Sequence, residues 1–345
     1  MNGYRSNLVI GAPLDAGHFG EVHLATDPVH GEVAVKIMRQ RAGETPAEWQ
    51  ARKAGLLAEA QRLKTAKHPN VVEVFHLVES DTSDAVHLVM EYCSGGSLQR
   101  CFTTGPLSLG LVRTYATQVT LGLQALHTRG LLHRDIKPGN ILIDANGVAR
   151  LGDFGLVTDD IIAGYASAQG YRDHLSPEVW IGRGTSVRSD VWALGMTIYR
   201  LLHGQDWYLR SPLPRFVVAN GGFADSLSWL PHITPKWRRF VRKMLNDDPD
   251  GRFQNAGQVL GGLAGLETEP AWSCSVVADE TRWDLTKKGR RTHVVWTQHG
   301  PRRFTWDARS EPIGRGNRRA LGGSVTRIGH TESERQLREF FARKF

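Results

Sequence analysis

The most constraining feature of the chain is a polar segment, residues 133–140, followed by two short apolar runs around an Asn-Gly pair. The runs are residues 141–143 and 149–151, and Asn-Gly is strongly favoured in tight hairpin turns. A hairpin brings the residue before its first strand close to the residue after its second strand. We therefore expect Asn140 and Asp153 to lie near each other, although they are well separated in the sequence.

These two side chains have the chemistry of a magnesium site, because carboxylate and amide oxygens are the hard donors that Mg²⁺ prefers. In the same polar segment, Asp135 can accept or orient the proton of an attacking hydroxyl group, and Lys137 can neutralise charge on a phosphate. Taken singly, an Asp or Asn is more typical of a turn. Their spacing and context favour a phosphoryl-transfer centre.

A glycine-containing segment, residues 14–22, lies between two candidate strands near the start of the chain. Glycines allow backbone N–H groups to approach a phosphate closely, although a plain β-turn has the same composition. The next candidate strand carries Lys36 among apolar neighbours. A helix expected over residues 47–66 carries Glu59, and an ion pair between Lys36 and Glu59 would hold the lysine towards the phosphates.

These segments together resemble the motifs of eukaryotic-type Ser/Thr protein kinases, which also occur in bacteria, over about residues 7–265. The matching segments are residues 14–22, 33–36, 68–71, 133–140, 153–155, 176–178 and 190–195, together with Arg252. The resemblance implies an α+β, two-lobed protein kinase fold, with a β-rich N-lobe over about residues 7–92 and a helical C-lobe over about residues 96–265. It also implies ATP and Mg²⁺ as cofactors and transfer of the γ-phosphoryl group to Ser/Thr hydroxyls.

The resemblance assigns a role to each matching residue. Asp135, Lys137 and Lys36 would be catalytic, and Asn140 and Asp153 would bind the metal. The ATP site would comprise Leu14, Ala16, Gly17, His18, Phe19, Gly20, Val22, Ala34, Lys36, Glu59, Met90, Glu91, Cys93 and Leu142. Two further implied roles are structural: Glu178 pairs with Arg252, and Asp190 anchors the backbone of the catalytic loop.

Two residues depart from the family pattern. Asp15 stands where the family usually has the first glycine of its loop, and Tyr171 stands where Ser/Thr kinases usually have a threonine that faces the substrate. Arg134 precedes the catalytic Asp, as it does in relatives whose activation segment is phosphorylated. We therefore expect autophosphorylation at Thr158 or Ser167, within residues 156–175, with an unregulated loop as the alternative.

The charge of the chain is unevenly distributed. The net charge is +8, from 43 Lys and Arg against 35 Asp and Glu. Residues 270–345 hold 16 of the basic and 8 of the acidic residues, so residues 1–269 are neutral overall. Such a step in charge indicates two units with different partners.

The basic segment, residues 270–345, is expected to form a small C-terminal module. Apolar residues alternate in three runs, at Trp283 and Leu285, Val294 and Trp296, and Phe304 and Trp306, which predicts a three-stranded β-meander with one aromatic face. Residues 309–330 look irregular. Thr331 and Glu334 suggest a capping box before a terminal helix.

Three kinds of partner remain open for this module. Docking on the kinase domain is favoured because a unit of this size struggles to hold a core alone. An acidic protein partner comes next, and nucleic acid is possible but less favoured. No membrane partner is expected, because no apolar run is long enough to span a bilayer. The three cysteines show no C-x-x-C spacing, and a cytoplasmic location is expected.

Three functions fit the motifs. The first is an active Ser/Thr protein kinase, the second a pseudokinase scaffold, and the third a kinase for small molecules. The retention of Lys36, Asp135, Asn140 and Asp153 favours the first over the second. Residues 176–178 favour a protein substrate over a small molecule.

Overall fold

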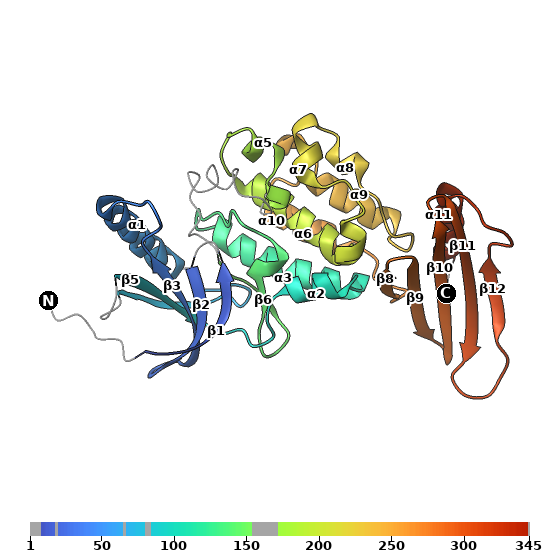
Figure 1. Ribbon diagram of the computed structural model, residues 1–345, viewed down its shortest axis with the longest axis horizontal. Coiled ribbons are helices and arrows are strands. Elements are labelled where there is room, and N and C mark those ends of the chain that lie inside the picture. Colours follow the sequence, from blue (N-terminus) through green and yellow to red (C-terminus); the bar gives the residue numbers. More distant parts are fainter. Residues whose placement is uncertain (1–7, 18–19, 65–66, 80–83, 154–171, 344–345) are drawn as a thin grey trace.

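The computed structural model describes residues 8–17, 20–64, 67–79, 84–153 and 172–343. A small β-rich lobe, a larger helical lobe and a C-terminal β-module follow one another along the molecule (Figure 1). This arrangement confirms the predicted α+β, two-lobed fold with an added module. The predicted positions His18, Phe19, Thr158, Ser167 and Tyr171 lie outside the described residues.

The small lobe is an antiparallel five-stranded sheet in the order β1-β2-β3-β5-β4. Its strands are β1 (Val9–Gly17), β2 (Gly20–Asp27), β3 (Gly31–Arg39), β4 (Val74–Glu79) and β5 (Ala85–Glu91). The central strand β3 is buried from Val33 to Met38, and this environment surrounds Lys36 with apolar side chains. Helix α1 (Pro46–Lys64) packs against β4 and matches the predicted helix to within two residues at each end.

The large lobe is built around α6 (Val187–Tyr208), whose apolar residues are almost all buried. The other helices are α2 (Leu98–Thr104), α3 (Leu109–His127), α5 (Pro177–Trp180), α7 (Pro214–Val217), α8 (Phe223–Ser226), α9 (Pro235–Met244) and α10 (Ala256–Ala264). The Ser186 side chain caps α6 in a reciprocal box with Ser189. Gly204 has φ 70° and interrupts this helix, which resumes as far as Tyr208.

The predicted hairpin between the polar segment and Asp153 is present. Strand β6 (Ile141–Ile143) pairs with β7 (Ala149–Leu151), and Gly147 adopts a left-handed conformation in the turn with φ 78°. The hairpin packs against the large lobe because Ile141, Ala149 and Leu151 are buried there. The chain therefore returns to the cleft between the lobes after one tight turn.

The C-terminal module contains a five-stranded antiparallel sheet, so the prediction of three strands was wrong. Its order is β12-β11-β10-β9-β8. The strands are β8 (Ser273–Val277), β9 (Glu280–Lys287), β10 (Arg290–Gly300), β11 (Arg303–Pro312) and β12 (Arg319–Gly323). The two unpredicted strands are the edges. Strand β8 carries two serines, β12 carries an arginine and two glycines, and pairing with a neighbour decides the conformation of both.

The terminal helix α11 (His330–Phe341) also begins differently from the prediction. Gly329 is its N-cap, and Thr331 lies inside the first turn, so the predicted capping box does not form. Ile328 is held in a β-bridge with Phe304, and the chain leaves the sheet directly into the helix. Leu337 and Phe340 then pack onto the aromatic face of the sheet, which is fully buried as the alternation predicted.

The module contacts the large lobe through this aromatic face. Trp283 Nε1 donates a hydrogen bond to His232 Nδ1 at 2.8 Å. The rings of Trp207 and Trp296 lie 6.2 Å apart. The Arg210 guanidinium donates to the carbonyls of Val277 and Ala278 at 2.7 and 3.1 Å, which holds the turn after β8 against the large lobe. Within the described part of the chain, no helix is both long and apolar enough to span a bilayer.

Candidate active site

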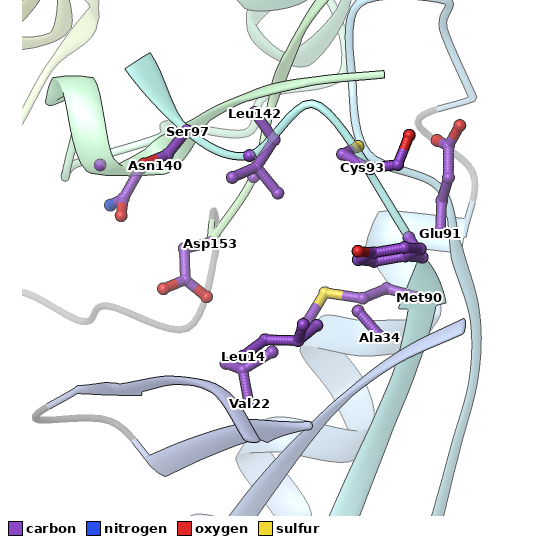
Figure 2. Close-up of a pocket in the computed structure, with 15 residues that line it drawn as sticks. Leu14, Val22, Ala34, Met90, Glu91, Cys93, Ser97, Asn140, Leu142 and Asp153 are labelled. Carbon is purple, nitrogen blue, oxygen red and sulfur yellow. The ribbon is translucent and has the colours of Figure 1, made fainter. Parts of the chain in front are cut away.

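A cavity of about 240 Å³ lies between the two lobes. Figure 2 shows Leu14, Val22 and Ala34 on its small-lobe side and Asn140 and Asp153 at its polar end. The described residues that line it are Leu14, Val22, Ala34, Met90, Glu91, Tyr92, Cys93, Ser94, Gly96, Ser97, Gly139, Asn140, Leu142, Gly152 and Asp153. An apolar slot that opens onto hard oxygen donors suits a flat ring carrying phosphates.

Lys36 reaches the polar end of the cavity from β3. Its Nζ lies 2.5 Å from Asp153 Oδ1, and the lysine side chain is only 3% exposed. Burial tends to raise the pKa of Asp153, but the charge and hydrogen bond of Lys36 outweigh it and keep that pKa below the usual value. Asp153 is therefore ionised at neutral pH, as a metal ligand must be.

The polar segment forms a tight cluster around Asp135. Lys137 Nζ donates to Asp135 Oδ2 at 2.8 Å. The Asn140 amide nitrogen donates to both the Asp135 carbonyl and its Oδ2, each at 2.8 Å. Because the nitrogen is committed in this way, the amide oxygen of Asn140 remains for a cation. Asn140 and Asp153 both line the cavity, where the hairpin places them.

His133 and Asp190 fix the backbone of this segment. Asp190 accepts hydrogen bonds from the backbone N–H groups of His133 and Arg134, both at 2.9 Å. The buried His133 ring contacts the Gly152 carbonyl through Nε2 at 3.0 Å and accepts from the Asp135 N–H through Nδ1. Burial lowers the pKa of His133, so the ring is neutral, which this pattern of one donor and one acceptor requires.

Two residues of the site hold the left-handed backbone conformation that non-glycine residues rarely adopt. Arg134 has φ 71° and Asp153 has φ 57°. Such strain persists only where surrounding contacts maintain it, and it is concentrated at functional sites. Here the contacts are those of Asp190 with Arg134 and of Lys36 with Asp153.

The apolar end of the cavity is formed where β5 leaves the small lobe. Met90 and Cys93 are buried there, and the Glu91 N–H donates to the Glu73 carbonyl at 2.9 Å. The Cys93 carbonyl accepts from Gly96 N–H at 3.2 Å. Burial raises the pKa of the Cys93 thiol to about 12, so this wall of the cavity carries no thiolate charge.

Some predicted residues are only partly described. The backbones of Ala16, Gly17 and Gly20 pair within the β1–β2 hairpin that overhangs the cleft. Glu59 lies on α1, but its side chain is outside the described part, so the predicted Lys36–Glu59 ion pair stays a prediction. The side chain of Asp15 is also outside it.

The predicted Glu178–Arg252 pair is present below the site. Two parallel hydrogen bonds of 2.8 Å join the guanidinium to the carboxylate. The Arg252 side chain is fully buried, and it also donates to the carbonyls of Asn246 and Arg188. Burial opposes ionisation of Glu178, but the arginine outweighs it and lowers the pKa of the carboxyl group.

Residues 8–261 match the family described as "Protein kinase domain". The chain belongs to the protein kinase family. It is 30% identical over 74% of its length to "Serine/threonine-protein kinase PknB" of Mycolicibacterium smegmatis, of which it covers 42%. It is 33% identical over 74% of its length to "Serine/threonine-protein kinase pkn2" of Myxococcus xanthus, of which it covers 32%. The chain thus spans less than half the length of these relatives.

A kinase domain requires ATP and a divalent cation in general, and the donor set of this one fits Mg²⁺. One carboxylate and one amide oxygen are typical of Mg²⁺, which completes its shell with phosphate oxygens and water. Among the described residues, no group of three or more His, Cys, Asp or Glu is placed to hold a metal ion.

Sequence reasoning missed several residues of the kinase cleft. Tyr92, Ser94 and Ser97 line the cavity because the chain turns back after Cys93, and the Gly95-Gly96 pair was the available signal. Gly95 has to be a glycine, because a Cβ there would lie 2.7 Å from the Ile143 carbonyl oxygen. The role of His133 was also missed, since its contacts lie within the fold.

Proposed function

We propose that this chain is an active, Mg²⁺-dependent Ser/Thr protein kinase that uses ATP. The proposal rests on Asn140 and Asp153, which line one cavity between the lobes. Lys36 contacts Asp153, and Asp135 accepts a hydrogen bond from Asn140. A scaffold that only binds partners has no need of all four groups. The family membership of residues 8–261 supports the same reading.

Each residue has a distinct part in the proposed reaction. Lys36 holds the α- and β-phosphates by charge, and the apolar slot between Ala34, Val22 and Leu142 holds the adenine ring. Asp135 accepts a hydrogen bond from the substrate hydroxyl and orients its oxygen for attack. Lys137 offsets negative charge on the transferred phosphoryl group. Mg²⁺ held by Asn140 and Asp153 supplies further charge neutralisation on the phosphates.

Regulation by autophosphorylation at Thr158 or Ser167 is part of the proposal. Its support is Arg134, a cation beside the catalytic residue, whose Nε donates to the Thr185 hydroxyl at 3.1 Å. A phosphate on the activation segment would give this guanidinium a doubly charged acceptor. Mass spectrometry of the active enzyme should find phosphate within residues 156–175. Full activity of phosphate-free enzyme would refute this regulation.

We also propose that the C-terminal module stays docked on the large lobe and that the protein works in the cytoplasm. The buried Trp283–His232 hydrogen bond and the Trp207–Trp296 contact support the docking. The three free cysteines support a reducing compartment. An acidic protein remains a candidate partner for the basic residues of the module.

Labelled ATP tests the function directly. The purified chain is incubated with γ-labelled ATP, Mg²⁺ and a generic basic protein, with Asp135→Ala as the matched variant. Label on Ser or Thr of the protein, lost in the variant, supports the proposal. ATP binding without transfer would indicate a pseudokinase. Transfer only to small hydroxyl compounds would indicate a small-molecule kinase.

A further inference from the structure

One end of the C-terminal sheet concentrates positive charge. The β9–β10 turn meets the β11–β12 loop there, because Ile313 N–H donates to the Gly289 carbonyl at 2.8 Å. In Figure 1 this is the lower end of the module, away from both lobes. We call it the basic end, and its basic residues are Lys287, Lys288, Arg290, Arg291, Arg315, Arg318 and Arg319.

Most of this charge is not balanced by nearby acids. Glu311 is the one acidic residue on the described segments that form the basic end, and it pairs with Arg318 at 3.1 Å. Arg290 is used internally, since it donates to Ser310 and to the Asn317 carbonyl. The remaining exposed cations, Lys288, Arg291, Arg315 and Arg319, make no ion pair with another described residue.

The opposite end of the same sheet has a different balance of positive and negative charge. Its basic residues Arg302, Arg303 and Arg327 are exposed. The acidic pair Asp279 and Glu280 lies at that end too, because the Gln298 N–H donates to the Asp279 carbonyl at 2.8 Å. The excess positive charge of the module is therefore localised at the basic end, and the opposite end provides a matched control.

An apolar side chain stands among the cations. Ile313 is 52% exposed on the β11–β12 loop, directly after Pro312. The loop also contains Gly314 and Gly316, both in conformations that favour glycine, with φ 110° and 139°. Exposed arginines around an isoleucine at a loop tip can contact phosphates while the apolar group enters a nonpolar layer.

The aromatic residues of the module offer no comparable surface to single-stranded nucleic acid. Trp283 is 0% exposed, and Trp296, Phe304 and Trp306 are 5–6% exposed. Base stacking requires accessible rings. A duplex could still contact the arginines through its phosphates, but it would leave Ile313 in water.

We propose that the basic end binds the surface of an anionic phospholipid bilayer, with its arginines on the lipid phosphates and Ile313 in the headgroup layer. Basic clusters of this size bind the negatively charged cytoplasmic leaflet without any spanning segment. The expectation that the chain has no membrane partner rested on the lack of a long apolar run, which does not bear on such peripheral contact. The membrane would then hold the kinase domain near proteins at its surface.

Vesicle binding by the full chain tests the proposal. Phosphatidylcholine vesicles with and without phosphatidylglycerol are sedimented with the wild type, with Arg291→Gln/Arg315→Gln/Arg319→Gln, and with the control Arg302→Gln/Arg303→Gln/Arg327→Gln. We expect binding only to the anionic vesicles, weakening as salt is added. Each charge removed from the basic end should weaken the affinity for anionic vesicles roughly fivefold, and the triple variant should bind about a hundredfold more weakly than wild type. The control variant has the same net charge as the triple variant of the basic end, but its affinity for vesicles should stay within about twofold of wild type.

Ile313→Ser separates a bilayer from a nucleic acid. It should weaken vesicle binding several-fold and leave binding to a duplex oligonucleotide unchanged. Absence of vesicle binding at low salt would overturn the proposal. Equal losses in both triple variants would overturn it too, because charge alone would then explain binding. Tighter binding to the duplex, with no effect of Ile313→Ser on vesicles, would assign the surface to nucleic acid. Denaturant unfolding of each variant checks that its fold is unchanged.

Discussion

Lys36, Asn140 and Asp153 meet at the polar end of the cavity, although they come from distant parts of the sequence. The hairpin predicted from the sequence brings Asn140 and Asp153 together, and both residues line the cavity. Lys36 contacts Asp153, and its expected pairing with Glu59 stays a prediction because the Glu59 side chain lies outside the described part. Residue spacing alone could not predict that Lys36 reaches Asp153, because this contact depends on where β3 and the hairpin lie in space. His133 could not be assigned a role for the same reason.

Asp153→Asn tests the metal assignment. An amide binds Mg²⁺ more weakly than a carboxylate, so turnover should fall by at least about a hundredfold and require more Mg²⁺. The measurement is turnover against Mg²⁺ concentration. Asp225→Asn, an exposed acidic residue on α8, is the control and should behave as wild type. Unchanged Mg²⁺ dependence in Asp153→Asn would show that another residue holds the metal.

At the level of secondary structure, segments with a regular pattern of apolar residues were predicted from the sequence, whereas the edge strands of the C-terminal sheet were not. The helix expected over residues 47–66 is present as α1, to within two residues at each end. Strands β8 and β12 were missed because each pairs along only one side and carries polar or glycine residues. The start of α11 was misplaced because a bridge at Ile328, formed in the tertiary structure, decides where the chain turns.

Asp190 on α6 positions the catalytic loop, and Asp190→Asn tests this. The amide retains one acceptor but cannot accept both backbone N–H groups with the strength of a carboxylate, so Arg134 should lose its strained conformation. We expect kcat to fall by about tenfold or more, with little change in KM for ATP. A parallel rise in KM for ATP at unchanged kcat would contradict a positioning role.

The Arg252–Glu178 pair should matter for stability rather than for chemistry. Arg252→Ala leaves a largely buried carboxylate without its partner and should lower the free energy of unfolding by about 3–5 kcal/mol. Adding Glu178→Gln should recover part of that loss, since the unpaired charge is removed. Denaturant unfolding measures both variants. Equal stabilities of the single and double variants would argue against an uncompensated charge.

At the scale of the whole molecule, one hydrophobic core runs from the small lobe through the large lobe into the C-terminal module. The sequence indicated that the aromatic rings of the module point inward, and they do. It could not indicate which part of the large lobe they would meet. That surface is formed by Trp207 and His232, which are distant in sequence and carry no shared motif.

Buried histidines should make the fold sensitive to acid. Burial lowers the pKa of His232 and of His203 to about 3, against about 6.5 in the unfolded chain. Their stabilising contribution is complete above pH 6.5 or so and is lost as the pH falls below that value, because only the unfolded chain then binds protons. Each of the two histidines should lower the free energy of unfolding by about 2 kcal/mol between pH 7 and pH 5.

His232→Gln isolates the contribution of the contact between the large lobe and the module. Glutamine can still accept the Trp283 hydrogen bond but does not titrate. The loss of unfolding free energy between pH 7 and pH 5 should therefore shrink by about 2 kcal/mol relative to wild type. His299→Gln, at an exposed position of the module, should leave the wild-type pH dependence in place. If His232→Gln still lost as much unfolding free energy as wild type between pH 7 and pH 5, protonation of another group would have to explain the acid sensitivity.

The proposed function requires the cavity between the lobes to bind a magnesium-loaded nucleotide, with Lys36, Asn140 and Asp153 at its polar end. Isothermal titration calorimetry with ATP, in the presence and absence of Mg²⁺, measures this most directly. We expect saturable binding of one nucleotide per chain, which weakens strongly without Mg²⁺ and in Lys36→Ala. Absence of binding heat at saturating ATP and Mg²⁺, in a protein that unfolds cooperatively, would contradict it.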